Sequence, residues 1–249
     1  LSIISGYLYY TVSRKKKRLF NKKVKTLAIP YLVANIVVLI PVLTLTFFFE
    51  YNALNRLSYD SSLILEGIFS LNSPPVNPPT YFIRDIFIIF SIIALISQKE
   101  YKTLIILTPL ILFGTIILRF DVASLFLIGL LFGYSKYVLN KNYLILLSAV
   151  STVVIAIWFP SYLKFPISFL IFVMALDFDF KFYNTGRYSY LLHLYHTPII
   201  VITYPVLSMF INNSLLLILA QIILAIITVY ILFIIVTKHK FLKILSGGR

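Results

Sequence analysis

Cysteine is absent from this chain of 249 residues, and carboxylates are scarce. Without cysteine the chain forms no disulfide and offers no thiolate to a metal. Eight Asp and Glu residues and three His residues supply few other ligands, so we predict no metal site and no permanently bound cofactor. A separate basic domain is also lacking. This absence argues against nucleic acid as the partner of the 22 Lys and Arg residues.

Apolar residues, by contrast, are abundant. They make up 60% of the chain, and the mean hydropathy is +0.97. Because a helix needs about 20 apolar residues to cross a bilayer, the repeated long runs predict an all-α polytopic transmembrane bundle in contact with the lipid bilayer. The eight predicted full spans are residues 27–49, 80–97, 103–118, 122–138, 142–158, 162–177, 188–210 and 214–237.

The first twelve residues are apolar but too few for a full span, because about half of the required length is missing. Residues 1–12 therefore predict the end of a helix whose beginning precedes residue 1. No Gly/Ser linker, soluble domain or short-period repeat interrupts the remainder. We predict a single membrane domain over residues 1–249.

The basic residues are distributed asymmetrically between the loops. If Arg14–Lys25 is cytoplasmic, the only cations outside are Arg56, Arg119 and Lys164, and Arg84 lies within a span. Such a bias is the positive-inside pattern of helical membrane proteins. It explains most of the net charge of +14 through topology and contact with anionic lipid.

The longest predicted loop is the external segment of residues 50–79. A loop of this length is typical of a functional element or of disorder, and we favour a lid or an acceptor-side wall. Within it, Ser61–Phe69 is long enough for a short interfacial or re-entrant helix. Ser73–Pro79 contains four prolines, which predict a rigid, extended run without helix.

Ionisable residues inside spans are costly and are candidates for function. Arg84 and Asp85 lie about one turn inside the outer end of the span 80–97. Adjacent residues point about 100° apart on a helix, so the sequence predicts that at least one of them faces a partner helix or a wet cavity. A structural ion pair, or an arginine that reaches the headgroups, is the alternative.

A histidine lies near the middle of the span 188–210. His196 is nine residues from Arg187 and therefore about 14 Å deep. His193 is on a similar face, and Pro198 and Pro205 open the backbone hydrogen-bond ladder. An imidazole at this depth suits binding or proton transfer. Packing against a neighbouring helix is the alternative.

Lys22 and Lys25 are three residues apart at the cytoplasmic end of the first full span. This spacing puts them on one helix face, where they could hold a phosphate such as that of a nucleotide or coenzyme A. Positive-inside anchoring explains them equally well.

Four ordered segments resemble the acyltransferase-3 family of integral-membrane acyltransferases. Ile4–Leu8 (ISGYL) is similar to the family's FxxSGFLL, and Lys23–Tyr31 (KVKTLAIPY) to its basic-x-basic-x-x-x-x-Pro-Tyr pattern. Tyr81–Ile86 (YFIRDI) resembles WFLRDL, and Ser189–Ile199 (SYLLHLYHTPI) resembles SYxxYLxHxPI. Phe126–Gly133 also fits a glycine-bearing helix of the family.

The resemblance implies a ten-helix enzyme that moves an acyl group, usually acetyl, from cytoplasmic acetyl-CoA to a sugar hydroxyl of a cell-surface polysaccharide or its lipid-linked precursor. Eight full spans, one partial span and one before residue 1 agree with ten helices. On this basis the chain lacks the first helix and part of the second, and a bacterial cytoplasmic membrane is the expected location.

The resemblance also implies roles for residues. Lys22 and Lys25 would hold the coenzyme A phosphates, and Arg84 and Asp85 would position the acceptor or orient an outer gate. His196 would face the path between donor and acceptor. The family's favoured catalytic histidine is in its first helix, so it is expected upstream of residue 1, and the chain as given is expected to be impaired in turnover.

Several residues depart from the family pattern. The basic pair is commonly two arginines, and lysines remove bidentate recognition of phosphate. Tyr81 replaces a tryptophan, and His193 replaces a tyrosine. Two other classes stay open from the sequence: a transporter or flippase of polysaccharide or small solutes without covalent chemistry, and a non-catalytic membrane scaffold.

Overall fold

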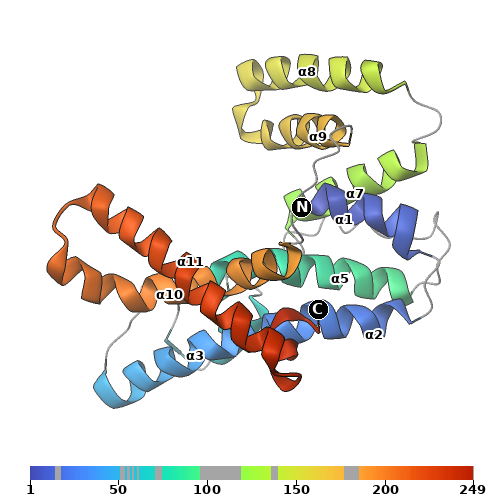
Figure 1. Ribbon diagram of the computed structural model, residues 1–249. Helices are drawn as coiled ribbons and strands as arrows, with labels where there is room; N and C mark the ends of the chain where they lie inside the picture. Colours follow the sequence, from blue (N-terminus) through green and yellow to red (C-terminus); the bar gives the residue numbers. More distant parts are fainter. Residues whose placement is uncertain are drawn as a thin grey trace. The chain divides into compact units, whose positions relative to one another are not determined.

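The computed structural model describes residues 1–14, 18–50, 54, 57, 59–60, 62–70, 75–95, 119–135, 140–176 and 185–248. Each regular element in these ranges is helical (Figure 1), which confirms the predicted all-α class. The chain forms two compact units. Unit 1 comprises Leu1–Phe20 and Ile88–Phe182, and unit 2 comprises Asn21–Phe87 and Tyr183–Arg249. The single domain expected from the sequence stays a prediction.

Close contact between two short helices organises unit 1. Helix α1 (Ser2–Leu8) continues into the π-helical turn η1 (Tyr9–Ser13) and packs on α7 (Phe120–Ser135). A Cβ atom added to Gly6 would lie 2.0 Å from the Phe126 carbonyl oxygen, and one added to Gly129 would lie 2.0 Å from that of Ile3. Only glycine permits this approach, which is the small-residue packing of membrane helices.

Two further helices complete the described part of unit 1. Helix α8 (Lys141–Trp158) turns through the 3₁₀ helix η4 (Pro160–Tyr162) into α9 (Lys164–Ala175), and the two run side by side (Figure 1). Asn140 caps α8, because its side chain accepts the Asn142 N–H. Edge-to-face rings of Tyr7, Phe132 and Phe172 connect α1, α7 and α9.

A long continuous helix enters unit 2. It consists of α2 (Leu19–Lys23), the π-helical turn η2 (Val24–Ala28) and α3 (Ile29–Phe49). Pro30 is in the first turn of α3, where its missing N–H costs no hydrogen bond. Glu50 ends α3 in the left-handed conformation at φ 52°.

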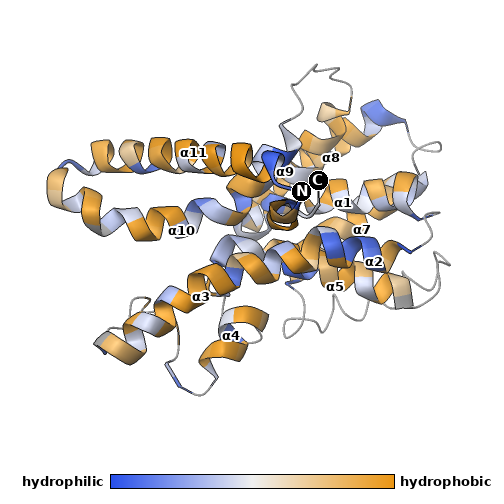
Figure 2. Ribbon diagram, turned by 60° about the horizontal axis from the view of Figure 1, so that its bottom comes forward, coloured by the Kyte–Doolittle hydropathy of each residue, from blue (hydrophilic) through white to orange (hydrophobic). Residues whose placement is uncertain are grey.

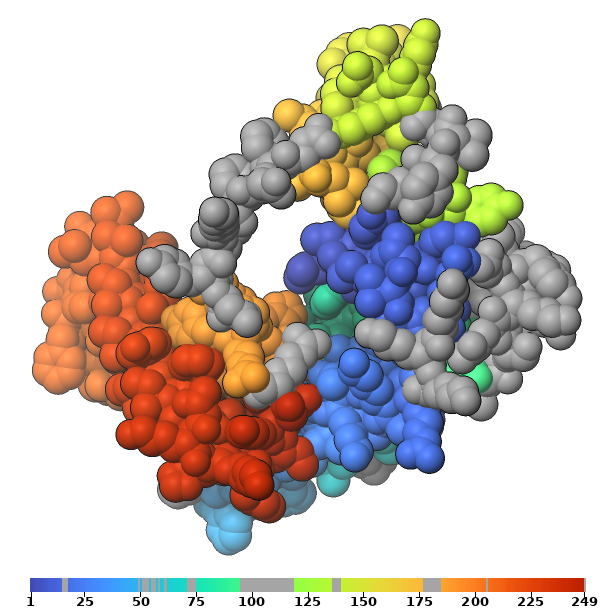
Figure 3. All heavy atoms as spheres, turned by 45° about the vertical axis from the view of Figure 1, so that its right-hand side comes forward, coloured from blue at the N-terminus to red at the C-terminus, as the bar shows by residue number. Residues whose placement is uncertain are grey.

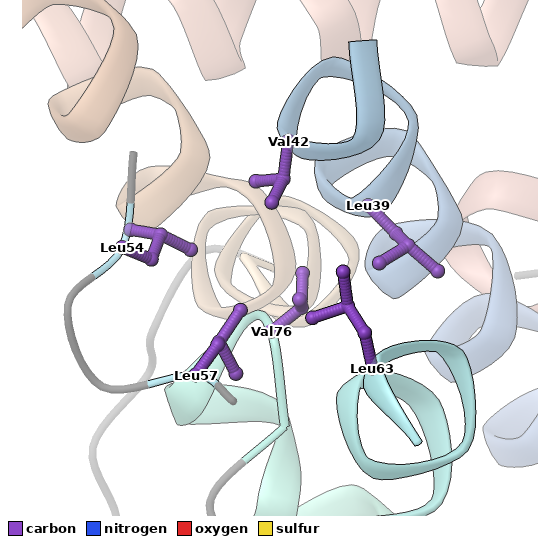
Figure 4. Packing of buried hydrophobic residues seen from close by; sticks show 6 residues of the cluster. All are labelled: Leu39, Val42, Leu54, Leu57, Leu63 and Val76. Carbon is purple, nitrogen blue, oxygen red and sulfur yellow. The ribbon is translucent and has the colours of Figure 1, made fainter. Parts of the chain in front are cut away.

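The predicted loop helix is present as α4 (Leu63–Phe69). It packs on α3 through buried side chains that Figure 4 shows converging from α3, α4 and the segments beside α4. These residues are Leu39, Val42, Leu54, Leu57, Leu63 and Val76. The Gly67 carbonyl accepts the Val76 N–H at 2.8 Å, which folds the chain back after α4.

The expectation of no helix in Ser73–Pro79 is wrong at its end. Pro78–Thr80 forms one 3₁₀ turn, η3, which leads directly into α5 (Tyr81–Leu95). Proline suits the first positions of a helical turn, since these N–H groups need no partner there. The Thr80 hydroxyl closes the turn on the Asn77 carbonyl oxygen at 2.6 Å.

The last helices form an antiparallel pair. Helix α10 (Gly186–Phe210) packs along α11 (Ser214–Lys238), and the red and orange spheres of this pair lie against each other in Figure 3. The Tyr188 ring meets Tyr230 and Phe233 edge to face. Helix α10 stays continuous through Pro198 and Pro205, so these prolines do not end it.

Three helices in the described part of the chain are long and apolar enough to cross a membrane: Leu19–Phe48, Lys141–Trp158 and Ser214–Lys238. Figure 2 shows α11 as apolar along nearly its whole length. Within the described residues, the helices at the predicted spans 80–97, 122–138 and 162–177 are shorter, and the span 103–118 lies outside those residues. The eight spans are therefore not confirmed.

Candidate functional site

Unit 2 contains every candidate residue of the sequence analysis. Lys22 is in α2 and Lys25 in the π turn η2, and both are exposed. The wider π turn frees backbone groups from the α-helical pattern and is often found at functional sites. Next to Lys25, the Thr26 carbonyl accepts the Tyr190 hydroxyl of α10 at 2.9 Å. The basic end of α3 is thus tied to the start of α10.

The C-terminal segment also packs at this end. The 3₁₀ helix η5 (Phe241–Ser246) follows α11 and contacts α3 and α10. Gly247 has φ 73°, and a Cβ atom there would lie 2.7 Å from the Thr26 carbonyl oxygen. Both the backbone angle and the close approach require glycine. The tail from Lys238 therefore closes against the same turn that carries Lys25.

A buried polar network links α3, η3 and α10. The Asn35 Nδ2 group donates to the Tyr31 carbonyl at 2.9 Å and to Thr80 Oγ1 at 3.0 Å, and its Oδ1 accepts the Asn77 N–H at 3.1 Å. The Asn77 Nδ2 group donates to the Leu194 carbonyl of α10 at 2.7 Å. Asn35, Asn77 and Thr80 are at most 1% exposed. Three segments far apart in sequence share one set of bonds.

Arg84 and Asp85 form the charged part of this region. The Asp85 carboxylate is fully buried and accepts Arg84 Nε at 2.8 Å and Nη2 at 2.7 Å. Arg84 Nη1 also donates to the Phe69 carbonyl at 2.9 Å and to the Ser70 carbonyl. Because helix ends leave carbonyls without partners, the guanidinium anchors the C-terminal end of α4 to α5.

The structure agrees with both interpretations of Arg84 and Asp85. The two side chains are bonded to each other, as the ion-pair alternative expects, and Arg84 also faces a partner helix, as the sequence predicts for at least one of them. Arg84 and Asp85 are adjacent in sequence, but the long arginine side chain reaches around the helix to the Asp85 carboxylate.

Hydrogen bonds to α3 show how far the loop between α3 and α5 returns along that helix. Tyr31 donates its hydroxyl to the Ile68 carbonyl, and Asn35 bonds Thr80. Asn35 is 14 residues before Phe49, which corresponds to about 21 Å along the helix. The segment between α3 and α5 therefore runs back beside α3 and ends nearer its basic end than its apolar end. Arg84 and Asp85 are about one turn inside the start of α5, and their depth in a membrane stays a prediction.

The two histidines of α10 differ in their partners. His196 Nδ1 hydrogen-bonds the Leu192 carbonyl at 2.7 Å and Nε2 is 3.2 Å from Thr197 Oγ1, so its ring is bonded within its own helix. The Pro79 carbonyl accepts a hydrogen bond from the His193 ring, and Nε2 of His193 is buried without a partner among the described residues.

A carbonyl partner on one ring nitrogen leaves the lone pair on the other. His193 Nε2 is therefore the α10 imidazole nitrogen that can accept a proton without first breaking a bond. Asn77 Oδ1 is a second buried acceptor without a partner in the described residues. The structure does not bring His196 into the Asn35 network, and its predicted role stays a prediction.

The carboxylates and histidines of the described residues do not form a candidate metal site. No group of three or more His, Cys, Asp or Glu residues with metal-binding geometry occurs in the described ranges. Near α4, the Asp60 carboxylate accepts the Ser62 hydroxyl at 2.6 Å and the Ser62 N–H at 2.8 Å, and these bonds lower the pKa of Asp60. Asp60 is fully exposed, so this is a local turn and not part of the site.

Sequence reasoning missed the amides and the hydroxyls of this region. Asn35 was detectable as a lone amide in the apolar run 27–49, because a buried polar group requires a partner. Asn77 lies between prolines and gave no comparable signal. Comparison of the chain with protein-family models, curated proteins and solved structures gives no match.

Proposed function

We propose that this chain is a membrane-bound O-acyltransferase that resembles the acyltransferase-3 family. It moves an acyl group, which we take to be acetyl, from cytoplasmic acyl-CoA to a hydroxyl of a cell-surface polysaccharide or its lipid-linked precursor. Its setting is a bacterial cytoplasmic membrane, crossed by the eight spans that the positive-inside pattern predicts.

The observation that carries the proposal is the hydrogen-bonded connection between three of the family-like segments. The segment with Pro30 and Tyr31 bonds α4 and, through Asn35, reaches η3 just before Arg84 and Asp85. Asn77 then bonds the histidine helix α10. Packing alone needs no such polar core, and polar residues in membrane helices are retained mainly where they serve function.

The donor is held at the basic end of the long helix. Lys22 and Lys25 are exposed there, and the tail segment η5 packs beside them. They bind the phosphates of coenzyme A as point charges, without the bidentate geometry of arginine. The thioester of the bound donor then extends toward the polar network, which begins at Asn35, ten residues or about 15 Å beyond Lys25 along the helix.

The chemistry is attack of the acceptor oxygen on the thioester carbonyl. The C–O bond forms, the C–S bond breaks, and the hydroxyl proton passes to a base while coenzyme A leaves as its thiol after protonation. His193 Nε2 has the free lone pair for this proton. Arg84 and Asp85 hold α4 and position the acceptor, and His196 lines the path between the two substrates.

Labelled donor tests the proposal directly. Membranes that contain the protein are incubated with acetyl-labelled acetyl-CoA and host polysaccharide, and base-labile label is measured in the polysaccharide. We expect transfer above membranes that lack the protein. Label that stays on the donor while the polysaccharide or solute crosses the membrane would instead identify a transporter.

A charge-matched pair of variants tests the donor site. Lys22→Gln/Lys25→Gln should raise KM for acetyl-CoA at least about 10-fold, because a charge-assisted hydrogen bond contributes about 1.5–3 kcal/mol. Arg119→Gln/Lys164→Gln removes two exposed cations of unit 1 and should leave KM unchanged. An equal KM for acetyl-CoA in both double variants would show that Lys22 and Lys25 serve membrane topology alone.

A further inference from the structure

The exposed side of the loop helix α4 is apolar. Ile64, Leu65 and Phe69 are each between 53% and 56% exposed. Because successive residues are about 100° apart on a helix, these three side chains occupy one arc of about 140°. The opposite side of α4 consists of Leu63 and Gly67, which are buried. Helix α4 therefore has a hydrophobic side that does not face its own core.

Helix α4 lies beside the middle of α3, and Figure 2 shows it as mainly hydrophobic. A Cβ atom on Gly67 would lie 3.4 Å from the Leu39 side chain, and Leu63 belongs to the same buried cluster as Leu39. Leu39 is nine residues, or about 14 Å, before Phe48, where the candidate membrane span Leu19–Phe48 ends. If α3 crosses a bilayer, α4 is therefore at the level of the hydrocarbon.

The carbonyls at the C-terminal end of α4 accept hydrogen bonds from other parts of unit 2. These carbonyls belong to Gly67, Ile68, Phe69 and Ser70. The donors are the Val76 N–H, the Tyr31 hydroxyl of α3 and the Arg84 guanidinium of α5. Water would bond such carbonyls without help from the protein, whereas hydrocarbon offers them no partner. A helix end that is bonded internally in this way suits a lipid environment.

The turn before α4 has the opposite character. Asp60 is fully exposed, and its carboxylate accepts the Ser62 hydroxyl at 2.6 Å and the Ser62 N–H at 2.8 Å. An exposed carboxylate belongs in water or among headgroups. The two ends of α4 therefore suit different surroundings, as in a helix that enters the bilayer from its surface.

We propose that α4 is a re-entrant helix whose side formed by Ile64, Leu65 and Phe69 contacts acyl chains of the leaflet on the side of the predicted external loop. A lid in water would expose this apolar side at a cost in free energy. It would also not need internal partners for its last carbonyls. The inference uses the crossing of α3 and does not depend on the proposed acyl transfer.

Site-directed spin labelling tests this surface, because the chain has no cysteine of its own. Ile64→Cys, Leu65→Cys and Phe69→Cys are labelled with a nitroxide in vesicles of phosphatidylethanolamine and phosphatidylglycerol. Ile40→Cys, at an exposed position of α3, is the lipid reference, and Asn212→Cys, exposed between α10 and α11, is the water reference. Power saturation compares access of oxygen, which concentrates in lipid, with access of a water-soluble nickel chelate.

We expect the three α4 labels to be open to oxygen and protected from the chelate, as in Ile40→Cys. The apolar side of a helix that lies on a bilayer is buried by about 5–10 Å, so the Phe69→Cys label should be deeper than about 10 Å. Elution profiles and melting curves equal to those of the cysteine-free parent identify the labelled variants that remain folded.

Several results would overturn the proposal. Access of the chelate to Leu65→Cys and Phe69→Cys at the level of Asn212→Cys would identify a lid that faces water. Protection from both reagents would show that protein, such as a second copy of the chain, covers this side. Equal depths of about 5–10 Å for all three labels would identify a helix on the bilayer surface. Access of the chelate to Ile40→Cys would show that α3 does not cross the bilayer, which removes the basis of the inference.

Discussion

Different interactions stabilise the interior of each unit. In unit 1, α1 and α7 approach through Gly6 and Gly129, and aromatic edges fill the space beside them. In unit 2, the contacts between α3, η3 and α10 include buried hydrogen bonds of Asn35, Asn77 and Thr80. Lipid supplies no hydrophobic driving force between helices, so both close packing and polar bonding are available to membrane proteins.

The difference concerns the hydrogen-bonding groups around the candidate residues. Glycine contacts stabilise without placing a donor or an acceptor in the protein interior. A buried amide network costs desolvation unless each group is satisfied, and that of unit 2 leaves His193 Nε2 and Asn77 Oδ1 without partners in the described residues. Both atoms are in the unit that contains the candidate residues, and the proposed reaction is assigned to unit 2 for that reason.

The largest expected effect is on the glycine packing of unit 1. Gly129→Ala forces a methyl group against the Ile3 backbone, whereas Gly133→Ala meets the Tyr10 side chain at 3.0 Å. We expect the first to lower stability by about 3 kcal/mol, the upper part of the usual range for overpacking, and the second by less than half as much. Thermal unfolding in micelles measures both. Equal losses would contradict the backbone contact of α1 and α7.

The next effect separates the two histidines of unit 2. His193→Ala should reduce acyl transfer about 100-fold, the lower limit for loss of a general base, with unchanged protein level. His196→Ala removes bonds within α10 only and should reduce transfer less than 10-fold. Turnover of labelled acetyl-CoA at saturating donor is the measurement. A larger loss in His196→Ala would restore the role that the sequence predicts for it.

The smallest effect is on the polar network. Asn35→Leu leaves Thr80, the Asn77 N–H and the Tyr31 carbonyl without their amide partner, and we expect a stability loss of about 2 kcal/mol. Asn212→Leu changes an exposed residue and serves as the control. Unfolding in increasing SDS compares them. No difference between the two variants would mean that the network does not stabilise unit 2.

The helices themselves were largely predictable. The spans 142–158 and 214–237 agree with α8 and α11 within one residue, because apolar runs are bounded by the caps Asn140 and Asn213. The loop helix at Ser61–Phe69 was also expected, and α4 begins at Leu63. Local pattern decides these elements, and the sequence contains that pattern in full.

The return of the loop was not predictable. The contact of Thr80 with Asn35 joins residues 45 apart, and no local pattern encodes such a pairing. The sequence placed Arg84 and Asp85 about one turn inside the span 80–97, but it did not indicate that this end of the helix lies beside Asn35. For the site, the sequence identifies Arg84, Asp85 and the histidine helix, but the choice between His193 and His196 depends on the Pro79 carbonyl, which another segment supplies.

The return of η3 along α3 has a consequence for the proposed acyl transfer. Asn77 and Thr80 bond Asn35, which is about 9 Å along the helix axis from Ile29, the first residue of α3. Under the proposed topology, with the basic end of α3 in the cytoplasm, an acetyl group would have to move only a short distance between compartments, not the roughly 30 Å of hydrocarbon. A small rearrangement would then expose one reacting centre to both sides.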